Sequence, residues 1–236
     1  MPATTGNLLL DALSPELQAE ILSLGRAIDL PSRTVLHEQG ERSTYVYFLY
    51  SGVASVVVTM AEGGSAEVCL TGHEGLVGAL QLLGPAPPPS QCYMLLPGSA
   101  LRVRSEELSQ LFLNTRELRV RILEFLQHQG ICLEQTTACN KLHETEQRMV
   151  RWLLLCHDRF RQDTMTLTQE FMASILGTRR TTVTMVAGSL QERGMISYRR
   201  GRITILSHQE LEKAACHCYR VCSDALHNLY RHPITP

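Results

Sequence analysis

The most constraining feature of the sequence is a pair of short helix patterns followed at once by a hairpin pattern. The first helix is expected from Thr168, whose hydroxyl suits a helix N-terminal cap, to Gly177, which is typical of a helix end. The second helix is expected from Arg179 to about Glu192. After Gly194, apolar residues alternate on both sides of an arginine-rich turn, as in two paired strands. Helix, turn, helix and basic hairpin in this order predict a winged helix-turn-helix.

The second of these helices has two different faces. Val183, Ala187 and Leu190 repeat on one face, which is expected to pack on the first helix. The opposite face is small and polar, and an arginine stands at its start, which suits insertion into the major groove of DNA. Arginines at the hairpin tip suit the flanking phosphates. A small helical domain with a solvated basic loop is the alternative. The predicted DNA-binding residues are Thr168, Arg179, Arg180, Thr181, Thr182, Thr184, Met185, Arg199, Arg200 and Arg202.

Charge is divided unevenly along the chain, although the net charge is only −1. Residues 1–140 contain 8 Lys+Arg and 14 Asp+Glu, whereas residues 141–205 contain 11 and 6. A basic segment behind an acidic one indicates that the later segment meets a polyanion such as double-stranded DNA.

Residues 30–103 have the pattern of short strands separated by glycine-containing turns. Many short strands at this spacing predict an antiparallel barrel or jelly roll. An amphipathic helical region precedes them at residues 7–26, and its main helix is expected to start at Ser14-Pro15. The expected strands are residues 34–37, 45–50, 54–59, 66–70 and 92–96.

The sequence gives no support for an enzyme. A metal-dependent jelly-roll enzyme would need several histidines and a carboxylate around one metal, and the expected strands offer only His37. A nucleophile elbow, a P-loop and a dinucleotide-binding glycine pattern are all missing from the sequence.

A long helix follows the strands and carries one repeating face. Its apolar or small positions step alternately by four and three residues, which is the heptad pattern of paired helices. We therefore expect a homodimer joined along this face. The alternative is a single helix packed on its own β-roll. The predicted dimer-interface residues are Leu118, Ile122, Phe125, Gln129, Cys132, Thr136 and Cys139.

Three stretches, residues 30–41, 47–52 and 167–197, resemble the cAMP receptor protein / fumarate-nitrate regulator (Crp/Fnr) family of bacterial transcription regulators. The resemblance implies an α+β fold: an N-terminal cyclic-nucleotide-binding-like β-roll (jelly roll), a long dimerisation helix and a C-terminal winged helix-turn-helix. It also implies a homodimer on a near-palindromic operator in double-stranded DNA, with RNA polymerase as a candidate further partner. The implied domains are a sensor β-roll at 1–115, a dimerisation helix at 116–140, a DNA-binding domain at 141–206 and a helical extension at 207–236.

Two sites depart from what the resemblance implies. Arg180 matches the base-reading arginine of the family, but Thr181 and Met185 stand where the cAMP receptor protein has charged base contacts, which leaves the operator sequence open. In the ligand pocket, Gly78-Ala79-Leu80 and Pro89-Ser90 lack the ribose-binding carboxylate and the phosphate-binding arginine. A buried phosphate without a cationic partner would be costly. We therefore predict that the signal is not cAMP and is otherwise unknown.

The cysteines do not predict a cofactor. No cysteine precedes Cys69, so the N-terminal iron–sulfur cluster of the fumarate-nitrate branch is disfavoured. Cys216, Cys218, Cys222 and neighbouring histidines fall in an expected C-terminal helix that starts at Ser207. On one helix Cys216 would point about 200° away from Cys218, so we expect buried thiols and no metal site. Metal or redox sensing by these residues is the alternative.

No membrane or export signal is expected. The N-terminus lacks the positive region of a signal peptide. The uncharged stretch at residues 43–61 has the pattern of two strands, and the one at 75–101 contains five prolines. The sequence therefore predicts a cytoplasmic protein with reduced thiols and no membrane partner.

Overall fold

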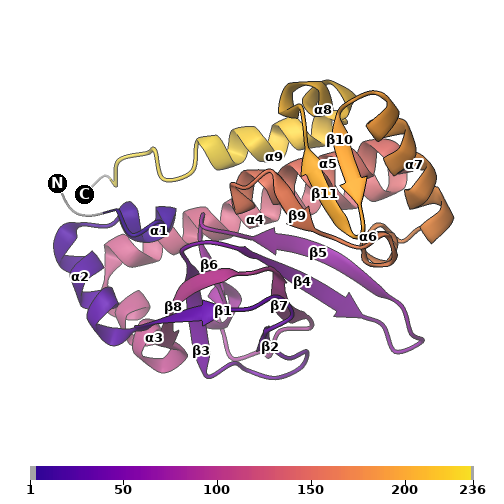
Figure 1. Ribbon diagram of the computed structural model, residues 1–236. Coiled ribbons are helices and arrows are strands. Elements are labelled where there is room, and N and C mark those ends of the chain that lie inside the picture. The colour runs from indigo at the N-terminus through magenta and orange to yellow at the C-terminus, as the bar shows by residue number, and fades with distance from the viewer. Residues whose placement is uncertain (1–3, 235–236) are drawn as a thin grey trace.

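The computed structural model describes residues 4–234, and it confirms the expected α+β fold (Figure 1). Two short helices, α1 (Leu8–Asp11) and α2 (Pro15–Leu24), precede two four-stranded antiparallel sheets. One sheet has the strand order β1-β8-β3-β6 and the other β2-β7-β4-β5. The strands are β1 (Arg26–Leu30), β2 (Val35–His37), β3 (Tyr45–Leu49), β4 (Val53–Thr59), β5 (Ser65–Thr71), β6 (Leu76–Val77), β7 (Gln91–Leu96) and β8 (Gly98–Arg104).

The five expected strands are all present, and β1, β6 and β8 are additional. The tight turn between β3 and β4 needs a glycine, because Gly52 has φ +83° and a side chain there would meet the backbone oxygens of Leu96 and Pro97 at 2.9 Å. The two sheets enclose an apolar interior, in which Phe48 and Met94 are fully buried. This is the β-roll that the strand spacing predicts.

Helix α3 (Ser105–Asn114) leads to the long helix α4 (Arg116–Leu142), which lies along the β-roll (Figure 1). Leu118, Ile122 and Phe125 of α4 are fully buried in the core of the β-roll. The Phe125 ring lies so close to Gly75 that a Cβ on that glycine would come within 2.1 Å of it. These three residues of the predicted seam pack on the chain's own β-roll. This is the arrangement expected of a single helix packed on its own β-roll, the alternative to a dimer seam.

The other predicted seam residues also have partners within the chain. The Gln129 amide donates to Thr71 Oγ1 of β5 over 3.1 Å, and Cys132 lies 3.8 Å from the ring of His128. The Thr136 hydroxyl accepts from Arg151, and Cys139 is buried against Cys216. The expected dimer seam is therefore corrected at the four residues that the chain itself buries completely, which are Leu118, Ile122, Phe125 and Cys139. Gln129, Cys132 and Thr136 are half-buried, and their place in a dimer interface stays a prediction.

Helix α5 (Thr145–Phe160) is followed by the predicted helix-turn-helix and wing. These comprise β9 (Thr164–Thr166), α6 (Gln169–Leu176), α7 (Arg180–Glu192), β10 (Ile196–Arg199) and β11 (Arg202–Ile205). The three strands form one antiparallel sheet in the order β10-β11-β9. The apolar core under this unit continues into the β-roll, where Val53 and Leu70 join it.

The C-terminal extension forms two helices where the sequence predicted one. Helix α8 (His208–Ala214) starts at the expected cap, Ser207, whose side chain accepts from Glu210. The backbone is then extended at Ala215 and Cys216, and α9 (His217–His227) starts in a new direction along α4 (Figure 1). The expectation that Cys216 points away from Cys218 is therefore wrong, because the two residues are not on one continuous helix.

Within residues 4–234, no helix combines the length and the apolar character that crossing a membrane requires.

Candidate nucleic-acid interface

The first helix of the motif begins and ends as its end residues predict. The Thr168 hydroxyl accepts from the Phe171 amide over 3.2 Å and so caps α6. Gly177 ends the helix with φ +58°, the left-handed conformation that glycine adopts at little cost. Arg179 is the N-terminal cap residue of α7, so the helix itself begins at Arg180.

The inner face of α7 packs as its apolar spacing predicts. Val183 and Leu190 are fully buried and Ala187 nearly so, in the core shared with α5 and α6. The Thr184 hydroxyl donates to Gln169 Oε1 over 2.9 Å and adds a polar link between α6 and α7. These contacts hold α7 at a fixed angle to α6.

The outer face of α7 is open to solvent. Arg180, Thr181 and Thr184 are exposed, and Met185 has 68% of its surface exposed. Thr182 is half-buried at the edge of this face. The face is narrow and mostly small, so that it could approach the base edges of a major groove closely, with a guanidinium at its start to donate to guanine.

The wing presents three exposed arginines around a two-residue turn. Arg199 and Arg202 are opposite each other in the backbone register of the hairpin. The turn between them has φ +52° at Arg200 and φ +75° at Gly201. Positive φ at both turn positions fits the type I′ turn of a tight hairpin. The turn therefore places the Arg200 side chain at the tip of the wing.

The wing is fixed beside the start of α6. The Leu167 amide donates to the Gly201 oxygen over 2.8 Å, and the Tyr198 hydroxyl donates to the Leu167 oxygen over 3.0 Å. Burial raises the pKa of Tyr198, while the positive charge of Arg180 acts against that rise. The start of α7 and the wing thus lie close enough to interact.

The arginines of this surface are not neutralised by the protein. In the part of the chain that the structure describes, Arg179, Arg180, Arg199, Arg200 and Arg202 form no ion pair with a carboxylate. An unpaired basic surface of this kind attracts a polyanion. The structure thus brings nine of the ten predicted DNA-binding residues onto α7, its N-terminal cap and the wing. The tenth, Thr168, caps α6.

A second site is a pocket in the β-roll that is open to solvent. His37 and Gln81 line it with buried nitrogens that have no hydrogen-bond partner among residues 4–234, and burial lowers the pKa of His37. Gly78-Ala79-Leu80 and Ser90, the departures noted in the sequence, also lie in its wall. Its lining residues are His37, Val56, Thr71, Leu76, Val77, Gly78, Ala79, Leu80, Gln81, Pro88, Ser90 and Gln129.

None of these lining residues is an arginine, a lysine, an aspartate or a glutamate. The wall therefore offers neutral hydrogen-bonding groups and apolar surface, but no fixed charge for a phosphate.

Two polar links, one part-buried and one almost fully buried, join the β-roll to α5, and the sequence reasoning missed both. The Trp152 indole donates to Glu67 Oε1 of β5 over 2.6 Å. Arg159 pairs with Glu74 over 2.7 Å, with both side chains almost fully buried. The signal was present in part, since charged residues lie inside the strongly apolar stretch of α5, but the sequence does not show which acid meets which base.

Two groups of side chains in the described residues have the composition of metal ligands. His157, Asp158 and His208 form one, but it is half-exposed, and the histidines already pair with carboxylates: His157 with Asp163 and His208 with Asp158. The other group joins the buried Cys139, Cys216 and Cys218 to the half-buried His143.

Sequence comparison with known families gives two matches. The model of the Crp-like helix-turn-helix domain matches residues 147–214, and the model of the cyclic nucleotide-binding domain matches residues 27–115. The first covers the helix-turn-helix and wing described above, and the second covers the β-roll. A search of curated proteins found no match.

Solved structures with the same fold include three bacterial regulators. A protein from Eubacterium rectale assigned to the Crp/Fnr family of transcriptional regulators has a TM-score of 0.67 and 15% identity, covering 87% of this chain and 96% of its own. FixK2 from Bradyrhizobium japonicum has a TM-score of 0.68 and 14% identity, and the match covers 81% of this chain and 98% of FixK2. The c-di-GMP responsive global regulator CLP from Xanthomonas campestris has a TM-score of 0.64 and 17% identity, and the match covers 82% of this chain and 100% of CLP. At these identities the likeness shows the shared fold.

A cyclic nucleotide-binding domain and a Crp-like helix-turn-helix domain thus follow one another in this chain, with the arrangement of elements seen in those regulators. The chain belongs to the Crp/Fnr family of transcription regulators, and its helix-turn-helix is the DNA-binding part.

Proposed function

We propose that the protein regulates transcription as a cytoplasmic homodimer that reads a near-palindromic operator and responds to a signal other than cAMP. The observation that carries the proposal is the basic surface of α7 and the wing. Its arginines are exposed and unpaired in the described chain, while every apolar side chain of α7 except Met185 is at least partly covered.

The homodimer is supported by the outward face of α4, which replaces the buried residues of the predicted seam. Leu123 and Leu133 have 47% and 45% of their surface exposed there. At 100° per residue, Leu123, Leu126, Gly130, Leu133 and Thr137 fall within an arc of about 80°. They repeat at steps of three and four residues, and a Cβ at Gly130 would meet nothing within 4 Å. A second copy of α4 packed here would bury the exposed leucines and could approach closely at the glycine.

The lack of a response to cAMP is supported by the β-roll pocket. Its wall has no cation for the cyclic phosphate and no carboxylate for the ribose. The Xanthomonas regulator is described as responsive to c-di-GMP, so this fold serves a nucleotide signal other than cAMP in that protein. For the present chain, the neutral wall favours an uncharged ligand, with His37 and Gln81 as its hydrogen-bonding groups.

The decisive experiment is selection of bound sequences from a random DNA pool by the purified full-length protein at a stated salt concentration, with light scattering of the free protein in parallel. Enrichment of a two-fold symmetric site by a dimer supports the proposal. Enrichment of a single half-site by a monomer contradicts the homodimer. If nothing is enriched, with or without an extract of cytoplasmic small molecules, sequence-specific regulation is contradicted. RNA polymerase, the candidate further partner, is tested by adding it to the selected site and measuring cooperative binding.

A further inference from the structure

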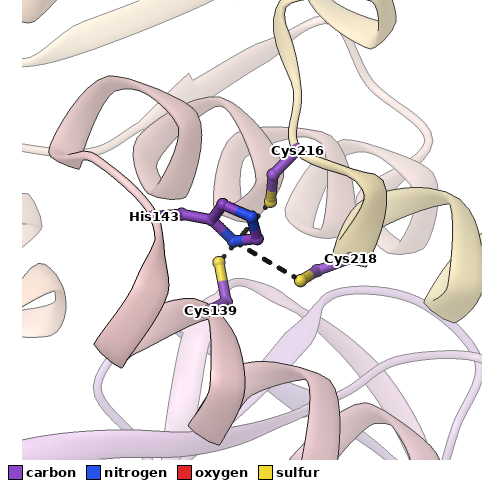
Figure 2. Close-up of side chains that lie close together, drawn as sticks. All are labelled: Cys139, His143, Cys216 and Cys218. Carbon is purple, nitrogen blue, oxygen red and sulfur yellow. Dashed lines mark hydrogen bonds between the residues drawn. The ribbon is translucent and has the colours of Figure 1, made fainter.

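Four potential metal ligands meet where the long helix ends and the C-terminal helix begins. Figure 2 shows Cys139 and His143 from the end of α4 facing Cys216 and Cys218 from the start of α9. One ligand atom from each residue lies within 4.8 Å of the ligand atoms of the other three. All three cysteines are buried, and His143 is half-buried.

Local structure explains why residues so far apart in sequence converge. Cys139 and His143 are four residues apart, so they lie on one side of the last turn of α4. His143 is the C-terminal cap residue of α4, and Cys216 is the N-terminal cap residue of α9. The extended backbone at Ala215 and Cys216 turns both Cys216 and Cys218 towards α4.

The distances fit one tetrahedral ion. With Zn–S bonds of about 2.3 Å and a Zn–N bond of about 2.0 Å, tetrahedral geometry separates two sulfurs by about 3.8 Å and a sulfur from a nitrogen by about 3.5 Å. The Cys139 and Cys216 sulfurs are 3.5 Å apart, and the Cys218 sulfur is 3.6 Å from Nδ1 of His143. The same separations are long for a disulfide, in which the sulfurs are about 2.05 Å apart.

The chemistry of the group also favours a soft divalent ion. Three thiols and an imidazole form the Cys₃His set of structural zinc sites. Thiols hydrogen-bond weakly, so mutual contacts among three of them give little reason for such convergence. Three other buried or half-buried cysteines, Cys69, Cys92 and Cys156, belong to no group of three or more potential metal ligands within the described residues.

We propose that Cys139, His143, Cys216 and Cys218 form a closed structural zinc site that fastens α9 to the end of α4. The site has four protein ligands and so leaves no position for a substrate, as in structural rather than catalytic zinc sites. It lies at the junction of α4 with α5, which begins two residues after His143. The ion would thus fix the joint between the β-roll helix and the DNA-binding unit.

The test is metal analysis of the full-length protein purified without a metal-affinity tag, under reducing conditions and with zinc in the growth medium. We expect about one zinc ion per chain, released by a mercurial that modifies thiols. Cys216→Ser and His143→Ala should retain less than a fifth of that zinc. Cys132→Ser is the matched control, since it removes a half-buried thiol of α4 outside the group, and it should retain the full amount.

A second measurement on the unaltered sequence covers the case in which the cysteine variants fail to fold. Replacing zinc by Co²⁺ should give the intense visible absorption of a tetrahedral ion and a thiolate-to-cobalt charge-transfer band in the near ultraviolet. The conservative variant His143→Cys should keep the ion and shift this spectrum. The proposal is overturned if the reduced wild type takes up neither zinc nor cobalt, if Cys132→Ser loses as much zinc as Cys216→Ser, or if Cys139 and Cys216 are found as a disulfide.

Discussion

Nε of Arg159 donates to Oε1 of Glu74 over 2.7 Å, and the two side chains are only 3% and 1% exposed. Arg159 is near the end of α5, and Glu74 lies in the turn between β5 and β6. The pair therefore ties the DNA-binding unit to the β-roll through charges that water hardly reaches. Burial, the largest single influence, would by itself raise the pKa of Glu74, but Arg159, His128, His73 and a backbone hydrogen bond together outweigh it, so the pKa is lowered.

Arg159→Met should lower the free energy of unfolding by about 3–5 kcal/mol, because it leaves the Glu74 carboxylate buried without its partner. Urea denaturation at pH 7 measures the change. The matched control is the half-exposed pair Arg193–Glu146, where Glu146→Gln should cost less than about 1 kcal/mol. Equal effects of the two substitutions would contradict the role of burial.

The pKa of Glu67 is shifted in the opposite direction from that of Glu74, and this shift predicts that the stability of the protein falls as the pH rises. Burial raises its pKa to about 7, despite the hydrogen bonds from Ser55 and Trp152. The native state therefore keeps the proton at pH values where the unfolded chain, with its ordinary pKa near 4.5, has lost it. The stabilisation that comes from this retained proton is fully present below pH 4.5 and is lost as the pH rises through 7.

Glu67→Gln should remove this dependence, because the amide keeps an oxygen for Trp152 but does not ionise. Between pH 5.5 and 8, the wild type should lose about 1–3 kcal/mol more of its free energy of unfolding than the variant. Urea midpoints at the two pH values measure the difference. A variant with the wild-type slope would exclude Glu67 as the titrating group.

On the DNA surface, Arg180 and Arg200 should have different effects. Arg180→Ala should cost about 1–3 kcal/mol of binding free energy and relax one operator position, because the arginine is expected to read a base. Arg200→Asn removes the charge but suits the left-handed backbone of the turn, and should weaken binding to all sequences alike. It should also lower the salt slope by about 0.9 per lost phosphate contact. Fluorescence anisotropy at several salt concentrations separates the two effects. Unchanged operator binding by Arg180→Ala would refute the prediction that α7 reads the bases of the operator.

The proposed dimer face is tested by Leu123→Glu, which should give a monomer in light scattering, because a charge would be buried between two copies of α4. Leu113→Glu is the control, since Leu113 is 62% exposed on α3 and outside the face. Leu123→Glu should bind a single half-site and lose cooperativity, whereas Leu113→Glu should remain a dimer. A dimer of unchanged mass and affinity would rule out this face.

Titration calorimetry of the wild type with cAMP should show no binding at micromolar concentrations. The neutral wall of the pocket offers the cyclic phosphate no partner for the charge that it would bury. Micromolar binding with one site per chain would overturn the assignment of a different signal.

The units of the fold were predictable where local periodicity decides the structure. The cap at Thr168, the glycine at position 177 and the alternation about Arg200-Gly201 each have a local cause, and the structure has all three. The heptad on α4 was equally clear, but periodicity shows that a helix face is buried and not which surface covers it. Here Phe125 packs beside Gly75 of the same chain.

The cysteine group could not be found in this way. Cys139 and Cys216 are 77 residues apart, and the sequence draws attention only to the Cys216-His217-Cys218 half of the group. The break that brings Cys216 round falls in an Ala-Ala-Cys sequence, which contains neither glycine nor proline to mark it. Only tertiary packing of α9 on α4 shows that these ligands meet.

Trp152 is the single tryptophan of the chain, and its indole donates to Glu67 at the contact between α5 and the β-roll. The tryptophan fluorescence of the unmodified protein therefore comes from the surface along which the β-roll and the DNA-binding unit touch. If these two parts separate when a signal arrives, the emission should move to longer wavelength as water reaches the ring. The molecule thus carries an optical probe at its own internal boundary, with which candidate signals can be screened without any label.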